Sequence, residues 1–534
     1  MTLKGRCLIF WRKIYWKNCN MLTILTIFFL LWFARTAKNV LFWVYLWQLK
    51  EYHSKRFADH FRTAKGRSLL LDKLATGKII LLLLFFLSPL IVFIVLPFIY
   101  LSESLKTGYG LYKKKLIKPV FTKKATVIIF LVFLLEIFFI IKSFSIIDEK
   151  IWLSILYFPL LLLTADLLTP LIVSLLVLAF QPLSWTVKKT VMAKAKRKRN
   201  SLQNLTVIGI TGSYGKTSTK EFLATILSSK YNVLKTKKNI NAEIGIAKTI
   251  LGELKPEHQI LIAEIGAYER EKIKEVCGMI RPKMGILTGI NSQHMATFGS
   301  QENIIKGKFE LIDSLPEKGI AIVNGNNDYI NERIGGYKGK TENIIVNNDI
   351  AKNVLVEKEQ LSFQINNASF KINVLGKHNL DNILLAIAAA QKLGMSLQEI
   401  SKACLDIKDN QIIKKIPVII NASYSANPTG VTADLEYLKL YAGKKAIVMP
   451  CLIELGESSK EVHKKIGEKI NEVCDLAVIT TKDHFAEIRE KTEKAVFIDN
   501  PQEIIKRLEG FKNPEDVILL EGRVPKQLIE SYAH

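Results

Sequence analysis

Two features are scarce in this sequence: paired cysteines and, in its first 200 residues, acidic side chains. The six cysteines of the 534-residue chain are scattered and form no Cys-x-x-Cys pair, which argues against a zinc ribbon or a disulfide scaffold and fits a reducing compartment. Residues 1–200 contain 31 Lys and Arg against 8 Asp and Glu, a net charge of +23. Residues 201–534 contain 44 against 41, a net charge of only +3. A nearly neutral second part argues against a nucleic-acid partner.

Long apolar runs fill the basic first part of the chain. Residues 79–101 carry no charge over 23 positions, which is enough to cross the roughly 30 Å hydrocarbon core of a bilayer. Further candidate spans are residues 21–47, 125–141 and 151–180. The sequence therefore predicts an all-α transmembrane region over residues 1–200, in contact with membrane lipids. A cleaved signal peptide is not expected, because the first apolar run is too long and no clear small-residue cleavage site follows it.

Basic segments between the apolar runs predict the orientation of this region. Residues 48–78 carry eight Lys and Arg, residues 102–124 carry seven, and residues 188–199 carry seven more. By the positive-inside bias, the segment before residue 200 faces the cytoplasm and meets anionic lipid head groups, which places everything after it in the cytoplasm. A simple span at 79–101 would put residues 48–78 outside. The number of spans therefore stays open between that arrangement and a re-entrant segment broken at its prolines.

Two acidic residues, Glu136 and Asp166, lie at membrane depth in these apolar runs. An ionisable group there marks a functional site, a polar contact between helices, or a group near the membrane interface. The sequence leaves all three interpretations open.

A phosphate loop opens the second part of the chain. The β-branched run 205–210 predicts a buried strand, and the sequence TGSYGKTS after it predicts a tight turn that opens a helix. Glycines let backbone N–H groups approach phosphate oxygens, the helix N-terminus adds the positive end of its dipole, a lysine reaches the outer phosphates, and a hydroxyl ligates Mg²⁺. The predicted ATP site comprises Thr211, Gly212, Ser213, Tyr214, Gly215, Lys216, Thr217 and Ser218, with Thr217 also on the metal.

The form TGxxGKTS, followed in order by several further segments, resembles the Mur ligase family, the ATP-dependent amide ligases that build the peptide stem of peptidoglycan. Asn239, Asn241 and Gly245 match an asparagine-rich loop and helix of the branch that adds D-alanyl-D-alanine. The resemblance implies two α/β domains: a P-loop ATPase central domain over residues 201–410 and a Rossmann-like C-terminal domain over residues 411–534.

The resemblance also implies roles for single residues in this site. Glu264 ends an apolar strand beside the phosphate loop, where a Mg²⁺ ligand is needed. His294 matches the metal-linked histidine of the family. Lys308 matches a lysine that many members carry as a carbamate, an anionic ligand for a second Mg²⁺. With Lys216, these three form the predicted catalytic set. The further positions matching the nucleotide site are Asn326, His378 and Asn382, the last two near the adenine.

The match is weaker in the C-terminal domain. Tyr424, Ala426, Asn427 and Pro428 keep a family element, and Glu454-Leu455-Gly456 and His463 keep another. In the first of these elements, Asn421 and Ala422 replace the paired acids of the family. The family begins with a soluble domain that holds the UDP part of the substrate, and here the membrane region takes its place.

These features predict a membrane-anchored ligase that uses ATP and Mg²⁺ to join a carboxylate to an amine through an acyl phosphate. Its substrates by resemblance are a nucleotide- or lipid-linked peptidoglycan precursor and an amino acid or dipeptide amine such as D-alanyl-D-alanine. One alternative is a membrane-anchored nucleotide-binding module that recruits or regulates wall-synthesis proteins without ligase activity, which Asn421 and Ala422 favour. A transport ATPase is a weaker alternative, because the sequence lacks the strand-borne Asp-Glu pair and the second signature motif.

Overall fold

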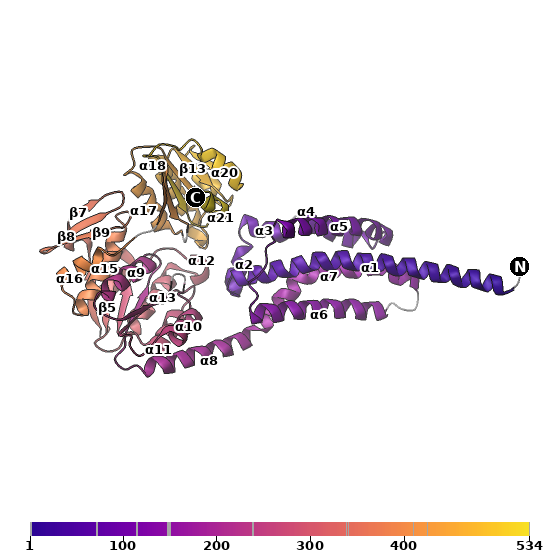
Figure 1. The fold of residues 1–534 in the computed structure, drawn as a ribbon, viewed down its shortest axis with the longest axis horizontal. Coiled ribbons are helices and arrows are strands. Elements are labelled where there is room, and N and C mark those ends of the chain that lie inside the picture. The colour runs from indigo at the N-terminus through magenta and orange to yellow at the C-terminus, as the bar shows by residue number, and fades with distance from the viewer. Residues whose placement is uncertain are drawn as a thin grey trace. The chain divides into compact units, whose positions relative to one another are not determined.

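The computed structural model describes residues 3–70, 73–113, 116–146, 151–237, 240–337, 339, 341–408, 411–423 and 426–532. The chain forms two compact units, Met1–Trp185 and Thr186–His534 (Figure 1). Asn239, Tyr424 and Ser425, three positions in segments that resemble the Mur ligases, lie outside the described residues.

The first unit is built from helices. The long ones are α1 (Leu3–Leu49), α5 (Pro89–Tyr112), α6 (Lys123–Ile146) and α7 (Ile151–Ala179), and the short ones are α2 (Ser54–His60), α3 (Ala64–Leu70) and α4 (Lys73–Leu84). Within the part of the chain that the structure describes, four stretches are long and apolar enough to cross a membrane: Leu25–Leu49, Pro89–Tyr112, Lys123–Lys142 and Tyr157–Asn200. Their membrane insertion stays a prediction from length and composition.

The apolar run 79–101 does not form one continuous helix. Helix α4 ends at Leu84, and Pro89 occupies the first turn of α5 after an extended residue at Ser88. Proline is favoured in the first turn of a helix, and the residue before a proline is disfavoured in helical conformation. Pro89 therefore explains why the helix is interrupted at this point. Pairing of Lys78 with Glu103 across the break shows that α4 and α5 fold onto each other. This is the break that the re-entrant alternative required.

The acidic residues within these apolar stretches make polar contacts between helices. Asp166 of α7 lies 2.6 Å from the Lys78 ammonium of α4 and accepts a hydrogen bond of 3.2 Å from Asn39 of α1. The same ammonium lies 2.6 Å from Glu103 of α5. Glu136 of α6 accepts a 2.7 Å hydrogen bond from the Thr169 hydroxyl. The structure therefore supports the helix-contact interpretation of both residues.

The second unit begins inside α8 (Gln181–Asn200), fifteen residues before the predicted boundary at 200. Met192 and Ala195 of this helix are buried in the core of the α/β unit. Lys188, in the basic segment, forms ion pairs with Glu243 and Glu275. Part of the basic segment predicted to face lipid is therefore built into the surface of the α/β unit.

The central sheet is entirely parallel, with the strand order β2-β3-β1-β4-β5-β6. Its strands are β1 (Thr206–Thr211), β2 (Val233–Lys235), β3 (Ile260–Glu264), β4 (Met284–Leu287), β5 (Ile320–Asn324) and β6 (Glu342–Val346). Its helices are α9 (Lys216–Ser228), α10 (Glu243–Glu253), α11 (Lys272–Ile280), α12 (Met295–Phe298), α13 (Gln301–Asp313) and α14 (Asp328–Gly335). The interior β1 lies between β3 and β4. Ligands bind at the carboxyl ends of such strands.

A small antiparallel sheet and two helices follow the central sheet. The strands are β7 (Lys352–Val356), β8 (Leu361–Ile365) and β9 (Ala368–Ile372), and the helices are α15 (Asn379–Lys392) and α16 (Leu397–Cys404). A capping box between Ser396 and Glu399 starts α16. The apolar faces of α9, α15 and the small sheet share one core, so α15 is fixed beside the helix that follows the phosphate loop.

The C-terminal domain is a second α/β domain, and its six-stranded sheet has the strand order β10-β11-β15-β12-β13-β14. Its strands are β10 (Ile412–Lys415), β11 (Val418–Ala422), β12 (Lys445–Met449), β13 (Leu476–Ile479), β14 (Ala495–Phe497) and β15 (Val517–Glu521). Its α-helices are α17 (Pro428–Leu438), α18 (Ser459–Val473), α19 (Phe485–Arg489), α20 (Pro501–Leu508) and α21 (Lys526–Tyr532). Among the described strands of this sheet, only the edge strand β10 is antiparallel to its neighbour, so the others end at a common carboxyl edge.

Candidate active site

The predicted phosphate loop joins β1 to α9 at the carboxyl edge of the central sheet. Gly215 precedes α9 with a φ of 76°, and a Cβ there would come within 2.2 Å of the Asn382 amide oxygen. A Cβ on Gly212 would come within 2.2 Å of the Thr288 hydroxyl. Both positions require glycine, because any side chain would collide with the strand or helix beside the loop.

The Lys216 ammonium lies over this loop. It donates hydrogen bonds to the carbonyl oxygens of Gly212 at 2.7 Å and Ser213 at 3.2 Å. Burial lowers the pKa of Lys216, and the nearby Glu264 carboxylate opposes that effect. The lysine is thus held at the end of the strand, where its charge can meet the outer phosphates of a nucleotide.

Other loop side chains attach the loop to neighbouring strands. The Thr211 hydroxyl donates to the carbonyl of Ile265 at 2.8 Å, and the Ser213 hydroxyl accepts from the backbone N–H of Asn291 at 3.2 Å. The Tyr214 hydroxyl accepts from Asn327 at 3.2 Å, and burial raises the pKa of this tyrosine. These contacts preserve the shape of the loop. Direct nucleotide contacts by these side chains, and by Ser218 in the first turn of α9, stay predictions.

Thr217 and Glu264, both predicted to hold Mg²⁺, lie in contact with each other. The Thr217 hydroxyl donates to Glu264 Oε2 at 3.0 Å, and the Asn241 amide donates to Oε1 at 3.2 Å. Sequence reasoning missed a third partner. Lys220, whose side chain is fully buried, places its ammonium 3.0 Å from Glu264 Oε2. Its position four residues after Lys216, one turn further along α9, was the signal that could have revealed it.

Thr217 and Glu264 offer the hydroxyl and carboxylate oxygens that Mg²⁺ prefers. Among the residues that the structure describes, no group of three His, Cys, Asp or Glu side chains could hold a metal ion. Mg²⁺ usually binds through one or two carboxylates and completes its shell with water and substrate phosphates. The pair therefore fits a nucleotide-bound Mg²⁺ better than an all-protein metal cage.

His294 lies just before α12. Its Nδ1 is 2.6 Å from Glu454 Oε2, and its ring meets Tyr268 edge-on with centroids 4.7 Å apart. Burial lowers the pKa of His294, and the positive charges of Lys308 and Lys216 act in the same direction, while Glu454 raises it. The residue thus lies within electrostatic reach of both lysines of the predicted catalytic set.

Lys308 is buried in α13. Its ammonium donates to the carbonyl of Ala267 at 3.4 Å and lies 5.6 Å from the centre of the Phe298 ring. Burial, reinforced by the charge of Lys216, lowers the pKa of Lys308 to about 7. A neutral amine is the form that reacts with carbon dioxide. The environment therefore suits carbamate formation, which stays a prediction.

The residues predicted near the adenine lie around the start of α15. Asn382 accepts a 3.3 Å hydrogen bond from Thr219 of α9, which places it against the phosphate loop. His378 lies 3.8 Å from Asp434 of the C-terminal domain. Asn326 donates to Asp381 at 3.2 Å. The structure brings Asn382 to the loop and His378 to the domain boundary, and their contact with a nucleotide stays a prediction.

The C-terminal domain contacts the central domain beside this site. Asn427 caps α17 by accepting from the Gly430 amide, and its side-chain oxygen also accepts a 3.1 Å hydrogen bond from Asn291. Asn421 and Ala422 end β11, and Ala422 is the register partner of Glu521 on β15. Asn421 and Ala422 carry no carboxyl group, and Glu521 places one at the end of the neighbouring strand.

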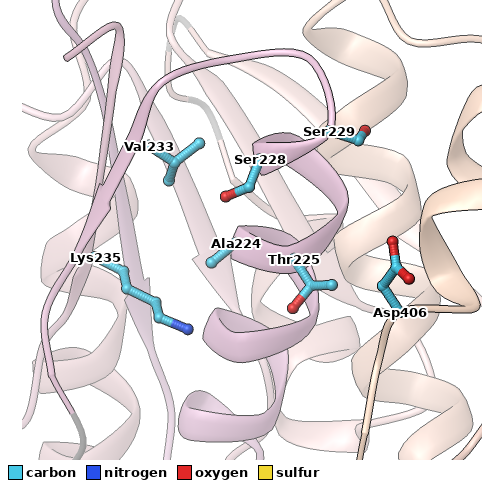
Figure 2. Close-up of a pocket in the computed structure, with 7 residues that line it drawn as sticks. All are labelled: Ala224, Thr225, Ser228, Ser229, Val233, Lys235 and Asp406. Carbon is cyan, nitrogen blue, oxygen red and sulfur yellow. The ribbon is translucent and has the colours of Figure 1, made fainter. Parts of the chain in front are cut away.

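A surface hollow lies along the C-terminal half of α9. Thr225, Ser228 and Ser229 line it, with Lys235 on one side and Asp406 on the other (Figure 2). The phosphate loop is at the opposite end of the same helix. None of the predicted site residues lines this hollow, so it is separate from the predicted nucleotide site.

A phosphate loop in a parallel sheet, followed by a second α/β domain that touches it, defines a two-domain nucleotide-binding protein. Residues 210–390 match the Mur ligase middle domain, and residues 410–524 match the Mur ligase glutamate ligase domain. Together these matches cover more than half of the chain. The chain belongs to the Mur ligase family, as its sequence resemblance predicted.

Several members of the family with assigned names are similar to this chain. The UDP-N-acetylmuramoyl-tripeptide–D-alanyl-D-alanine ligase of Escherichia coli is 32% identical over 283 residues, covering 49% of this chain and 61% of that protein. The protein of the same name from Bacillus subtilis is 33% identical over 300 residues, covering 53% and 65%. The chain thus spans less than two thirds of the length of either relative. The solved MurF ligase of Thermotoga maritima in complex with ADP superposes with a TM-score of 0.59 at 26% identity, covering 65% of this chain and 83% of that one.

Proposed function

We propose that this chain is a membrane-anchored, ATP-dependent ligase that joins a carboxylate to an amine in peptidoglycan precursor synthesis. The observation that carries the proposal is the assembly of Lys216, Thr217 and Glu264 at one strand edge, with the C-terminal domain in contact beside it. Two relatives, both named UDP-N-acetylmuramoyl-tripeptide–D-alanyl-D-alanine ligase, support this branch of the family.

In the proposed reaction, a substrate carboxylate oxygen attacks the γ-phosphorus of ATP, and ADP leaves. The amine then attacks the carbonyl carbon of the acyl phosphate, loses a proton and releases inorganic phosphate. The tasks of the protein are positioning and charge neutralisation. Lys216 and the N-terminus of α9 orient the phosphates, and the C-terminal domain excludes water when it is closed. Mg²⁺, held by Thr217 and Glu264, would supply further neutralisation of phosphate charge.

The substrates are proposed from the names of the relatives. The acceptor would be a precursor ending in the stem tripeptide, and the donor would be D-alanyl-D-alanine. Four apolar helical stretches precede or enter α8. A membrane-inserted first unit would hold the ligase domains at the cytoplasmic surface, where a lipid-linked acceptor competes with a UDP-linked one.

One observation favours a second candidate, a nucleotide-binding scaffold or regulator of wall synthesis without ligase activity. Asn421 and Ala422 stand at the end of β11 in place of the acids of the family. A site that binds ATP but cannot align an acceptor would keep the phosphate loop and lose turnover.

Phosphate release tests the proposal. The full-length protein in detergent would be given ATP, Mg²⁺ and D-alanyl-D-alanine with a UDP-linked tripeptide, a lipid-linked tripeptide precursor, or no acceptor. Phosphate release that depends on one of the two acceptors is the expected result. If neither acceptor stimulates release, the ligase assignment is overturned in favour of the scaffold. Lys216→Ala should abolish release, while Lys230→Ala, at an exposed lysine after the same helix, should not.

A further inference from the structure

A carboxylate from the C-terminal domain lies against the predicted metal-linked histidine. Glu454, in the loop after β12, places Oε2 2.6 Å from His294 Nδ1. Its backbone carbonyl also accepts a 3.2 Å hydrogen bond from the Ala296 amide. The side chains of Glu454 and His294 are 9% and 19% exposed, so the pair is largely shielded from water. Side chain and backbone together attach this loop to the start of α12.

The contact is made by two strained backbones. His294 has a φ of 67° and Glu454 a φ of 65°, both left-handed conformations that are uncommon outside glycine. Such conformations persist only where surrounding structure enforces them, and they gather at functional sites. Gly456, also left-handed at 57°, fits against Met295, where a Cβ would approach the methionine side chain to 3.2 Å. The two loops are therefore shaped to meet each other.

A second contact involves the same segment of the central domain. The side-chain amide of Asn291, three residues before His294, donates to Asn427 and to Thr429, each at 3.1 Å. Residues 291–296 thus touch the C-terminal domain at two places, the start of α17 and the loop after β12. Each contact needs the two domains to be together, so His294 acquires its carboxylate partner only in that arrangement.

A carboxylate can only accept a hydrogen bond from a neutral imidazole. Glu454 therefore fixes the proton of His294 on Nδ1 and leaves Nε2 with the lone pair. A histidine that ligates a metal through one ring nitrogen usually donates from the other to such a carboxylate, which sets the tautomer and the ring orientation. We propose that Glu454 is a positioning residue that acts through His294, selecting the Nδ1–H tautomer only when the C-terminal domain is closed. This inference rests on the proposed nucleotide site.

Ring nitrogen NMR tests the tautomer without any nucleotide. The full-length protein would be labelled with ¹⁵N in its histidine rings and studied at alkaline pH, with the His294 signal assigned by its loss in His294→Gln. The wild-type ring should show a protonated Nδ1. Glu454→Gln should shift the population toward protonated Nε2, Glu454→Asp should restore the wild-type pattern in part, and the control Glu457→Gln should leave it unchanged. Identical tautomers in wild type and Glu454→Gln would overturn the inference.

A metal titration gives the second readout. The Mg²⁺ concentration for half-maximal thermal stabilisation would be measured with a non-hydrolysable ATP analogue. Loss of an outer partner of a metal-bound histidine typically lowers metal affinity by about 10–100-fold, so Glu454→Gln should raise the midpoint by at least about 10-fold. A purely structural contact would lower the melting temperature without moving this midpoint, which would overturn the inference. If no variant responds to the analogue, the nucleotide proposal has failed, while the NMR result still decides the role of Glu454.

Discussion

Replacing Lys220 by methionine removes the only buried cation in direct contact with Glu264 among the described residues. The lysine side chain is fully buried, the glutamate is 2% exposed, and their charged atoms are 3.0 Å apart. Methionine preserves most of the volume but leaves the carboxylate without its partner. Removing one member of a buried pair typically destabilises a protein by about 3–5 kcal/mol, because the other charge stays desolvated. Hydrogen bonds from Thr217 and Asn241 remain, so we expect the lower end, about 3 kcal/mol.

The assay can separate the two units of the chain. All seven tryptophans lie at or before residue 185, so their emission reports the first unit. The described cysteines Cys277, Cys404, Cys451 and Cys474 are buried free thiols of the second unit. Labelling these thiols with a fluorogenic reagent during heating, in a background without Cys7 and Cys19, therefore reports unfolding of the α/β unit.

For a domain of about 150–250 residues, 1 kcal/mol shifts the melting temperature by about 2–4 °C. Lys220→Met should therefore lower the thiol-labelling midpoint by about 6–12 °C and leave the tryptophan midpoint in place. Adding Glu264→Gln should recover a large part of the loss, because it removes the orphaned charge. A shift below about 2 °C, or a double variant no more stable than the single one, would refute the argument that Lys220 neutralises Glu264.

Three further predictions test other parts of the molecule. Folding lowers the pKa of Lys308 from 10.5 to about 7, so between these two pH values the unfolded chain binds more protons than the folded one. The free energy of unfolding measured by calorimetry should therefore rise with pH across that range, and it should rise less in Lys308→Met. Lys78→Met leaves two buried carboxylates without their shared ammonium, so the tryptophan midpoint should fall, and an unchanged midpoint would contradict the pairing. Gly215→Ala should weaken ATP binding in a thermal-shift assay, since its Cβ meets Asn382, whereas Gly335→Ala, in open space, should not.

Local sequence patterns predicted the phosphate loop, but they could not predict contacts between residues far apart in the sequence. A β-branched run, a glycine-rich turn and a helix fall within a short stretch of chain, so the sequence alone indicated the strand-loop-helix around Lys216. Glu264 was predictable because parallel strands end at one edge of a sheet. Lys220 lies one turn after Lys216, a spacing that points to the same side of α9, but only the tertiary position of β3 explains its burial.

The same limit explains the domain boundary and the break in the apolar run. Composition alone placed residues 188–199 with the basic membrane region, because seven positive charges dominate that stretch. In the structure, Met192 and Ala195 turn one face of this helix into the α/β core, and Lys188 pairs with two glutamates. The few apolar side chains between the basic residues were too sparse to give a recognisable helical periodicity. The proline at 89, in contrast, was a local signal that the apolar run 79–101 would be interrupted.

The replaced acids of β11 do not leave this edge of the C-terminal sheet without carboxyl groups. Glu521 ends the neighbouring β15 as the register partner of Ala422 and is 1% exposed. Burial raises the pKa of Glu521 well above its ordinary value, and the nearby Asp434 carboxylate raises it further. Asp434 in turn lies 3.8 Å from His378 of the central domain. Carboxyl groups therefore lie close to Asn421 and Ala422, on the neighbouring strand β15 and on α17. Because carboxyl groups remain at this edge of the sheet, the two replacements alone are weak grounds for a protein that binds ATP without using it.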